Sequence, residues 1–156
     1  MSIDLELLRQ TDLFQGLTPD ELGKITGISA KESHEAGAVV FEEGQTGERF
    51  YLILKGEVRI SKLIPGVGEE ALVILKKGSY FGEMSLIDNQ PRSAHAICNK
   101  PSELMVIERA DFEKLLQKDK ELAYKLLWTF LRTLSRRLRE TNDKIMGFFA
   151  MTGPFK

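Results

Sequence analysis

The middle of the chain, from Lys31 to Arg109, is divided into short apolar runs by frequent glycines. The glycines lie at positions 37, 44, 47, 56, 66, 68 and 78. Runs rich in Val, Ile, Leu, Phe and Tyr are typical of β-strands, and glycines are typical of the turns between them. The predicted strands cover residues 38–42, 49–54, 57–63, 70–75, 93–98 and 103–107. We therefore expect a many-stranded antiparallel unit, and the spacing of the runs fits a small roll or barrel as well as a sandwich.

Helical patterns flank this β region on both sides. Thr18 offers an N-cap and Pro19 suits the first helical position, with acids in the turn that follows. After the β region, the segment DFEKLLQ predicts one helix, and a long helix is predicted from about residue 118 to 149. The predicted organisation is a helical cap over 1–30, a β unit over 31–109, C-terminal helices over 111–149 and a tail over 150–156.

The long helix carries an apolar stripe with alternating steps of four and three residues. Its members are Leu127, Leu131, Leu134, Leu138, Thr141, Ile145 and Phe148. This spacing is typical of the seam of a two-stranded coiled coil and predicts a parallel homodimer. In the alternative, the stripe packs on the β unit of its own chain, as amphipathic helices usually do.

Composition limits the class of protein. The 156 residues suit one domain, and 42% apolar and 29% charged residues are ordinary for a globular protein. A net charge of -1 and a pI near 6.2 provide no general attraction to nucleic acid or to an anionic membrane. The first residues lack a basic, strongly apolar leader and no segment is apolar enough to span a bilayer, so we expect a cytoplasmic protein. The single cysteine, Cys98, is expected to be a buried hydrophobe.

The segment FGEMSLIDNQPRSAHA, residues 81–96, combines residue types that suit a sugar phosphate. Gly82 lets the backbone approach an anion closely, and a short apolar helix predicted after it offers unpaired N–H groups. Arg92 provides a planar set of donors that matches phosphate oxygens. An anion would repel Glu83 unless its carboxylate faces a donor, and a ribose hydroxyl is a suitable donor. In the alternative, Glu83 and Arg92 form a structural salt bridge in an ordinary turn.

At these residues the chain resembles the phosphate-binding cassette of the cyclic-nucleotide-binding domain. This domain is shared by the bacterial catabolite activator protein family, protein kinase A regulatory subunits and cyclic-nucleotide-gated channels. The resemblance runs from about Leu13 through the long helix, with the cassette at residues 81–94. It implies a single domain over residues 1–156 with an α+β fold, in which an antiparallel, jelly-roll-like β-roll carries an N-terminal helical cap and a long C-terminal dimerisation helix.

The resemblance also implies a role for the residues of the cassette. Gly82 and neighbouring backbone amides, including that of Ser85, hold the cyclic phosphate. Glu83 accepts the ribose 2'-hydroxyl, Arg92 neutralises the phosphate, and Ser93 adds a hydroxyl contact. Apolar walls for the base are expected from three further positions, for which plain core packing is the alternative. The full predicted set, with the wall residues first, is Ile60, Leu72, Met84, Gly82, Glu83, Ser85, Arg92, Ser93, Ala94, Thr141 and Asn142.

The segment SRRLRETNDKI, residues 135–145, resembles the part of the family's long helix that presents a Thr-Ser pair to the adenine. Thr141 and Asn142 lie at the matching positions. Asn142 departs from the family's serine, but its amide both donates and accepts hydrogen bonds and suits adenine or guanine. Because Thr141 lies on the apolar stripe, the alternative is a polar residue that sets helix pairing without touching a ligand.

The predicted ligand is cAMP, with cGMP or a cyclic dinucleotide as alternatives. Only MTGPFK follows Ala150, which leaves no room for the helix-turn-helix module of the DNA-binding relatives. We therefore expect no direct DNA binding and no membrane contact. The apolar tail GFFAMTGPFK, which starts at Gly147, is a candidate docking site for a protein partner, or it folds back on the helix pair.

We expect no catalytic residue, no metal and no cofactor. The two histidines, His34 and His95, do not combine with carboxylates at metal-ligand spacing, and Ser93 lacks a base and an elbow motif. The expected function is a stand-alone regulatory module, a cAMP sensor that signals to a partner through rearrangement of its helix pair. A function of a different class stays open, in which the roll is a degenerate scaffold that binds protein without nucleotide.

Overall fold

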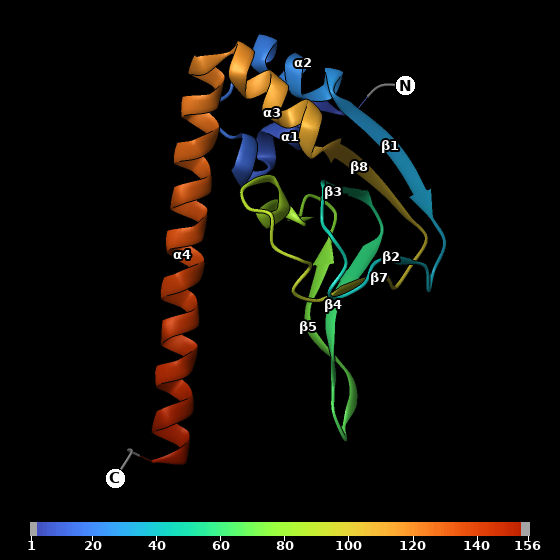
Figure 1. Ribbon diagram of the computed structural model, residues 1–156, viewed down its shortest axis with the longest axis vertical. Helices are drawn as coiled ribbons and strands as arrows, with labels where there is room; N and C mark the ends of the chain where they lie inside the picture. Colours follow the sequence, from blue (N-terminus) through green and yellow to red (C-terminus); the bar gives the residue numbers. More distant parts are fainter. Residues whose placement is uncertain (1–2, 154–156) are drawn as a thin grey trace.

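The computed structural model describes residues 3–153, which form two antiparallel four-stranded sheets with helices at one end (Figure 1). The strands are β1 Ser29–His34, β2 Val39–Phe41, β3 Arg49–Lys55, β4 Glu57–Ile64, β5 Gly68–Lys76, β6 Tyr80–Phe81, β7 His95–Cys98 and β8 Ser102–Glu108. One sheet has the order β1-β8-β3-β6 and the other β2-β7-β4-β5, and every pairing is antiparallel. The predicted antiparallel β-roll is confirmed.

All six predicted strands are present, with ends shifted by one or two residues. Two further strands, β1 and β6, were not predicted. The sequence of β1, SAKESH, contains no apolar run because this strand lies at a sheet edge with no fully buried side chain. Strand β6 has only two residues and is held by pairing with β3, so it has no length over which a periodic pattern can develop.

The helices are α1 Leu5–Gln10, α2 Pro19–Gly27, α3 Arg109–Lys118 and α4 Lys120–Thr152, with short 3-10 turns at Asp12–Phe14 and Glu83–Leu86. Thr18 caps α2 as predicted, and it forms a reciprocal capping box with Glu21. Helix α4 begins two residues after the predicted start at 118 and continues three residues past the predicted end at 149. The first part of the predicted tail is therefore helical, and residues 154–156 lie outside the described residues.

Strands β3 and β8 supply two separate apolar cores because their side chains alternate between the faces of one sheet. Phe50 of β3 and Met105 of β8 face the helices and pack with Phe14 and Phe130. The alternate positions along both strands face the interior of the roll, where they meet the second sheet. That second core contains Tyr51, Ile53, Val58, Phe81, Ala96, Cys98, Leu104 and Val106. Cys98 is fully buried, as predicted, and burial raises the pKa of its thiol.

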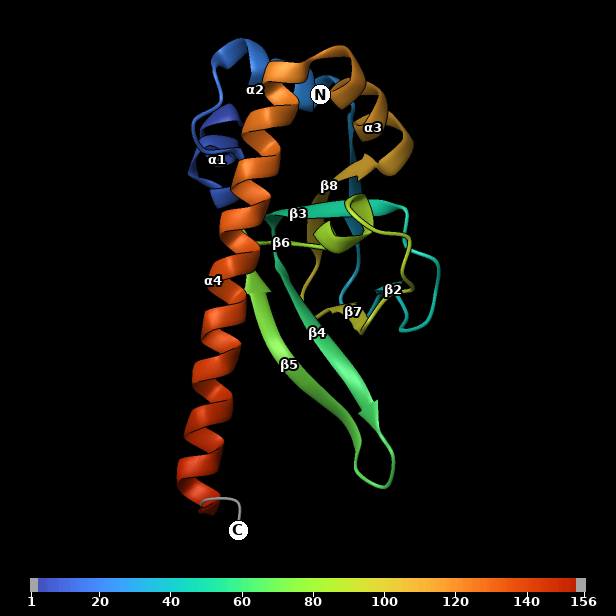
Figure 2. The same cartoon turned by 60° about the vertical axis from the view of Figure 1, so that its left-hand side comes forward.

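Among the described residues, the buried side chains of helix α4 lie in its N-terminal half. Its buried residues are Leu122, Leu126, Phe130 and Thr133. Figures 1 and 2 show the C-terminal half extending well past the helical cap, with the β4–β5 hairpin projecting in the same direction. The predicted seam is largely exposed in the single chain, since Leu131 is 58% and Leu138 63% exposed. Within residues 3–153, no helix is both long and apolar enough to cross a bilayer.

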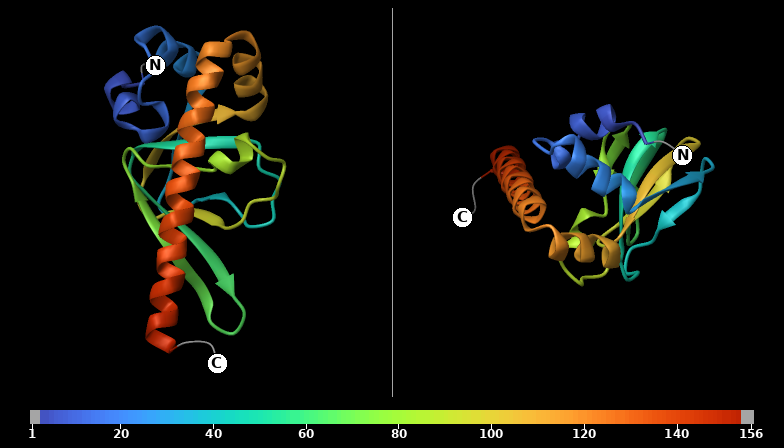
Figure 3. Two further views of the ribbon diagram at one scale, coloured as in Figure 1. Left: turned by 90° about the vertical axis from the view of Figure 1, so that its left-hand side faces the viewer. Right: turned by 90° about the horizontal axis from the view of Figure 1, so that it is seen from above.

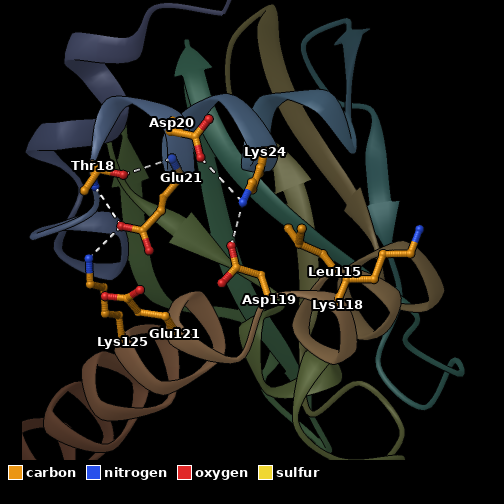
Figure 4. A pocket seen from close by; sticks show the side chains of 9 residues that line it. All are labelled: Thr18, Asp20, Glu21, Lys24, Leu115, Lys118, Asp119, Glu121 and Lys125. Carbon is orange, nitrogen blue, oxygen red and sulfur yellow. Dashed lines mark hydrogen bonds and ion pairs between the residues drawn. The ribbon is translucent and has the colours of Figure 1, made fainter.

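The N-terminal end of α4 is tied to α2 by two ion pairs. Figure 3 shows the cap helices gathered around this end of α4. Lys125 of α4 contacts the carboxylate of Glu21 at 2.7 Å, and Lys24 of α2 contacts Asp119, the N-cap of α4, at 2.7 Å. Both pairs line a polar cleft of about 500 Å³ between α2, α3 and α4 (Figure 4). These pairs fix the start of α4 against the cap.

Glu21 is the more buried of the two carboxylates. Burial acts to raise the pKa of its carboxyl, but hydrogen bonds from Lys125 and Thr18 outweigh burial and hold the pKa below its usual value. A carboxylate with a lowered folded-state pKa stabilises the protein above its unfolded pKa, and this stabilisation is lost as the pH falls. The ion pair between Glu21 and Lys125 should therefore stabilise the protein less in acid.

We predict that Glu21→Gln lowers the free energy of unfolding at pH 7 and makes it less dependent on pH. The amide keeps the size of the side chain but loses the charge, so the decrease between about pH 5 and about pH 3 should be smaller than in the wild type. Urea unfolding across this pH range measures both effects. Asp20→Asn is the matched control, because the Asp20 side chain is 82% exposed. Identical pH dependence in Glu21→Gln and the wild type would contradict this prediction.

Candidate functional site

A cavity of about 400 Å³ opens between the roll, the segment that follows β6, and α4. It is lined by Phe41, Ile60, Val73, Leu75, Tyr80, Phe81, Gly82, Glu83, Met84, Ser85, Asp88, Gln90, Pro91, Arg92, Ser93, Ala94 and Arg137. Eight of the eleven predicted ligand-binding residues are in this set. The volume falls within the range of small-molecule sites, and the lining combines apolar walls with a few charged groups.

The turn that begins at Gly82 carries polar groups that line the cavity, among them Glu83 and Ser85. Gly82 has a φ of 77°, in the left-handed region, and a Cβ at this position would lie 2.8 Å from Nη1 of Arg92. Glycine is therefore required both by the backbone and by the close approach of the guanidinium. The short helix predicted after Gly82 is a single 3-10 turn, in which the amide of Ser85 donates to the carbonyl of Gly82 at 3.2 Å. A turn this short provides local N–H groups and no substantial helix dipole.

Arg92 is a buried cation, with only 7% of its surface exposed. Its Nη1 donates to Oγ of Ser85 at 2.7 Å and its Nη2 donates to the carbonyl oxygen of Arg49 at 2.8 Å. The guanidinium stacks over the ring of Phe41, 4.1 Å from the centroid. Burial lowers the pKa of Arg92, and within residues 3–153 this side chain forms no ion pair. A buried guanidinium with neutral partners only is a site prepared for an anion.

Glu83 is also buried, and its carboxylate forms an ion pair with Arg137 of α4. Burial acts to lower the pKa of Arg137, but the charge and hydrogen bond of Glu83 outweigh it, so the pKa is raised. The structural salt bridge considered between Glu83 and Arg92 is absent from the described residues, because the carboxylate is engaged by α4 instead. Among the described residues, the charged groups that line the cavity are therefore Arg92, which forms no ion pair, Asp88, and the ion pair that joins the wall of the cavity to α4.

The apolar walls are partly as predicted. Ile60, Met84 and Ala94 line the cavity, and Ser93 adds a hydroxyl at its edge. The prediction for Leu72 differs from the structure, in which Leu72 is 58% exposed and Val73 lines the cavity. Ile60 pairs with Val73, and the register of the β4–β5 pair then shifts, so that Ser61 pairs with Ala71 and Leu72 has no partner on β4. Because side chains alternate along a strand, this phase turns Leu72 away from the site.

The structure does not bring Thr141 and Asn142 to the cavity of the single chain. Both are exposed, and the hydroxyl of Thr141 donates to the backbone carbonyl of Arg137 at 2.8 Å. This local bond within the helix satisfies the Thr141 hydroxyl without a ligand. Their predicted contact with a base stays a prediction.

Nine lining residues were not predicted as ligand-binding residues, among them Phe41, Tyr80 and Arg137. A signal for Arg137 was present in the sequence. The core-facing residues of α4 recur at steps of three and four from Leu122 through Phe130 to Thr133, and the next position in this series is Arg137. A charged residue that continues a buried helical stripe is expected to meet an opposite charge. The stacking of Phe41 and Tyr80 on arginines has no comparable signal, because it joins segments far apart in the chain.

Comparison of the chain with known proteins identifies a family that it matches. The family description "Cyclic nucleotide-binding domain" matches residues 31–119. The Cyclic AMP receptor protein of Thermus thermophilus is 33% identical over 135 residues, which cover 86% of this chain and 61% of that protein. The cGMP-dependent protein kinase isozyme 1 of Drosophila melanogaster is 35% identical over 115 residues, which cover 72% of this chain and 15% of the kinase.

Solved structures show the same likeness in three dimensions. The crystal structure of a cyclic nucleotide-binding domain from Methylobacillus flagellatus KT has a TM-score of 0.80 and 31% sequence identity, and the match covers 92% of this chain and 80% of that one. The chain spans about three fifths of the length of the Thermus receptor protein.

We predict that Gly47→Ala destabilises the protein and displaces Arg92. A Cβ at position 47 would lie 2.3 Å from Oγ of Ser85 and 2.7 Å from Nε of Arg92. The Ser85 hydroxyl and the guanidinium of Arg92 are held in place by the hydrogen bonds that Nη1 and Nη2 donate. Overpacking of this kind costs about 1 to 3 kcal/mol, which chemical unfolding measures. Gly23→Ala in α2 is the matched control, because a Cβ there meets nothing within 4 Å. Equal stability of the two variants would contradict this prediction, because it would show that the packing of Ser85 and Arg92 against Gly47 tolerates an extra methyl group.

Proposed function

Because the chain belongs to the cyclic nucleotide-binding domain family, we propose that it is a regulatory module that binds cAMP in the cavity beside Arg92 and transmits binding through α4. One observation carries the proposal. Arg92 is buried with neutral hydrogen-bond partners and no ion pair among the described residues, while the neighbouring carboxylate, Glu83, is engaged by Arg137. A monoanionic cyclic phosphate supplies the negative charge that this arrangement lacks.

The phosphate end of the ligand is placed next to Arg92 by the surrounding groups. The hydroxyls of Ser85 and Ser93 line the cavity on the same side, and Ser85 is already bonded to the guanidinium. Gly82, which has no side chain, lets the Arg92 guanidinium lie close to the backbone of this turn. Arg92 is positioned in advance by Ser85, Arg49 and Phe41, so little side-chain entropy is lost when the anion binds.

The ribose end of the ligand meets Glu83. A ribose hydroxyl donates a hydrogen bond and the Glu83 carboxylate accepts one, so this contact competes with or adds to the contact from Arg137. Because Arg137 belongs to α4, the ligand then alters the group that ties α4 to the cavity. A ligand shifts a conformational equilibrium only through contacts that differ between the states, and this is such a contact.

Two relatives named for cyclic AMP support cAMP as the proposed ligand. The Thermus receptor protein matches over 86% of this chain, and a cAMP-dependent protein kinase regulatory subunit matches over 71%. The Drosophila kinase named for cGMP matches over 72%, so cGMP is kept as the alternative. Thr141 and Asn142 lie just beyond Arg137 on α4, and we propose that they meet the base when two chains pair. In the single chain both side chains are exposed, and the Thr141 hydroxyl donates to the carbonyl oxygen of Arg137.

The output is proposed to be a change in the geometry of a parallel α4 pair. The seam residues Leu127, Leu131, Leu138 and Ile145 are each between 46% and 63% exposed in the single chain. Leu134 is partly buried and lies at the edge of this stripe. Leaving several large apolar side chains in water along one helix face is unfavourable, and a second copy of the helix covers them.

We predict that Arg92→Gln weakens cAMP binding by about 10-fold to 100-fold, because a charge-assisted hydrogen bond to a buried phosphate contributes about 1.5 to 3 kcal/mol. Isothermal titration calorimetry measures the affinity. Arg9→Gln is the control, since the Arg9 side chain is 49% exposed in α1. Unchanged affinity in Arg92→Gln would remove the basis of the assigned site.

A melting-temperature series with cAMP, cGMP and cyclic di-GMP distinguishes the proposal from its alternatives. A ligand at 100 times its dissociation constant adds about 2.7 kcal/mol of stability. The largest stabilisation is expected with cAMP. A larger stabilisation by cGMP or cyclic di-GMP would assign that nucleotide, and not cAMP, as the ligand. No stabilisation by any of the three would support the alternative of a scaffold that binds protein without nucleotide.

We predict that Leu138→Lys converts the dimer to a monomer, because it places two positive charges in an apolar seam. Sedimentation equilibrium measures the molecular mass. Glu140→Lys introduces the same side chain two residues away and outside the seam, so it should leave the mass unchanged. A wild-type protein that sediments as a monomer would contradict the proposed pairing through α4.

A further inference from the structure

His95 accepts a hydrogen bond from the backbone of a turn beside the cavity. It is the first residue of β7, and it is half-buried. Its Nδ1 accepts from the backbone amide of Glu43 at 3.1 Å. A ring nitrogen that accepts a hydrogen bond carries no proton, so this contact requires a neutral imidazole with its proton on Nε2. The bond connects β7 to residues 42–47, the turn that follows β2.

The same turn also holds Arg92. The amide of Gly44 donates to the carbonyl oxygen of Arg92 at 2.8 Å, and the amide of Arg92 donates to the carbonyl oxygen of Gln45 at 2.8 Å. At the end of the turn, a Cβ on Gly47 would lie 2.7 Å from Nε of Arg92. Phe41, which comes just before the turn, stacks on the guanidinium. Both the backbone and the side chain of Arg92 are therefore positioned by this segment.

Charged groups of both signs surround His95. The pKa of the Glu69 carboxyl on β5 is held below its usual value chiefly by the hydrogen bond from Arg59, and a charge on His95 acts in the same direction. The carboxylate of Glu43 pairs with Lys62 of β4 at 3.5 Å. The two acids favour a protonated imidazole, and the two bases oppose it.

We propose that His95 is a positioning residue for Arg92, and that protonation of its imidazole weakens nucleotide binding. The inference rests on the function proposed above, since it concerns the same site. A protonated imidazole carries an N–H on both ring nitrogens, so Nδ1 no longer accepts from the Glu43 amide and its own proton faces that N–H. The ring and the turn then separate, and the contacts of the turn with Arg92 loosen.

The direction of the pH effect follows from this contact. The arrangement that positions Arg92 needs a neutral His95, so nucleotide binding and protonation of His95 oppose each other. Histidine side chains change charge between about pH 5 and pH 8, whereas unperturbed carboxyls do so near about pH 4. A cyclic phosphodiester keeps its single negative charge across the histidine range. The affinity for the nucleotide should therefore fall as the pH falls.

A simpler role for His95 is to close a surface turn. The bond to Glu43 is exposed to solvent, and the guanidinium of Arg92 is also held by Ser85 and Arg49. If closing the turn were the only role, protonation would lower the stability of the protein and leave its affinity for nucleotide unchanged. The two roles therefore differ in whether the affinity depends on pH.

We predict that the affinity for cAMP falls about threefold from about pH 7.5 to about pH 5.5, because one solvent-exposed hydrogen bond is lost. His95→Leu has no acceptor and should bind about threefold more weakly at the higher pH, with no further loss in acid. His95→Asn places an oxygen near the position of Nδ1 but does not titrate, so it should bind like the wild type at the higher pH and keep that affinity in acid. Isothermal titration calorimetry measures these affinities.

The second histidine of the chain provides the matched control. His34 lies on β1, in the other sheet, where its Nε2 is 3.3 Å from the carboxylate of Glu32. His34→Asn should keep the pH dependence of the wild type.

Hydrogen exchange of the Glu43 amide, measured by NMR without nucleotide, tests the contact itself. Its protection should fall over the same pH range in the wild type and stay constant in His95→Asn. Constant protection in the wild type, or the same pH dependence of affinity in the wild type and His95→Asn, would overturn the role of His95 and leave the nucleotide site intact. A wild type that binds none of the three cyclic nucleotides at about pH 7.5 would overturn the proposed function, and the effect on binding with it.

Discussion

The burial of the Arg92 guanidinium is the constraint on which the rest of the site depends. Removing a cation from water is costly, and here the cost is offset by the Ser85 hydroxyl, the Arg49 carbonyl and the Phe41 ring, none of which carries a negative charge. These partners come from β2, β3 and the turn after β6, so this set of contacts around Arg92 forms only when both sheets of the roll are in place. Gly82 is needed because any side chain there would overlap the guanidinium. The fold therefore stabilises a cation that an incoming anion completes.

Helix α4 carries out two tasks with two different faces. One face, which includes Leu126 and Phe130, completes the core against the cap and the roll. A second face, which includes Leu131 and Leu138, is exposed and suits a second copy of the helix. Arg137 lies where the core-facing stripe reaches the cavity, and its ion pair joins this stripe to the segment that follows β6. The two tasks are thus joined at one side chain.

The sequence was sufficient for the parts of the fold and site that depend on neighbouring residues. Glycine-bounded runs predicted six strands, and the cassette around Gly82 is continuous, so its residues reach the cavity together. What depends on distant segments was harder to predict. The sequence predicts Leu72 as a wall residue in place of Val73, because which side chains of β5 face the cavity depends on the register of β5 with β4. Arg137 was missed because its partner lies 54 residues away in the chain. The exposed Thr141 depends on a second chain for its predicted role.

The arrangement of contacts along α4 explains how a small ligand can influence a long helix. The start of α4 is fixed to α2 through Lys125 and Glu21, and its middle is packed in the core. Beyond Arg137 the helix runs for 15 more residues to Thr152, about 22 Å at 1.5 Å per residue, and its side chains are almost all exposed. A helix of this kind moves as one body, so a small displacement at Arg137 grows with distance along it. In the proposed mechanism, a ligand that changes how Arg137 is held would therefore also change the geometry of the seam.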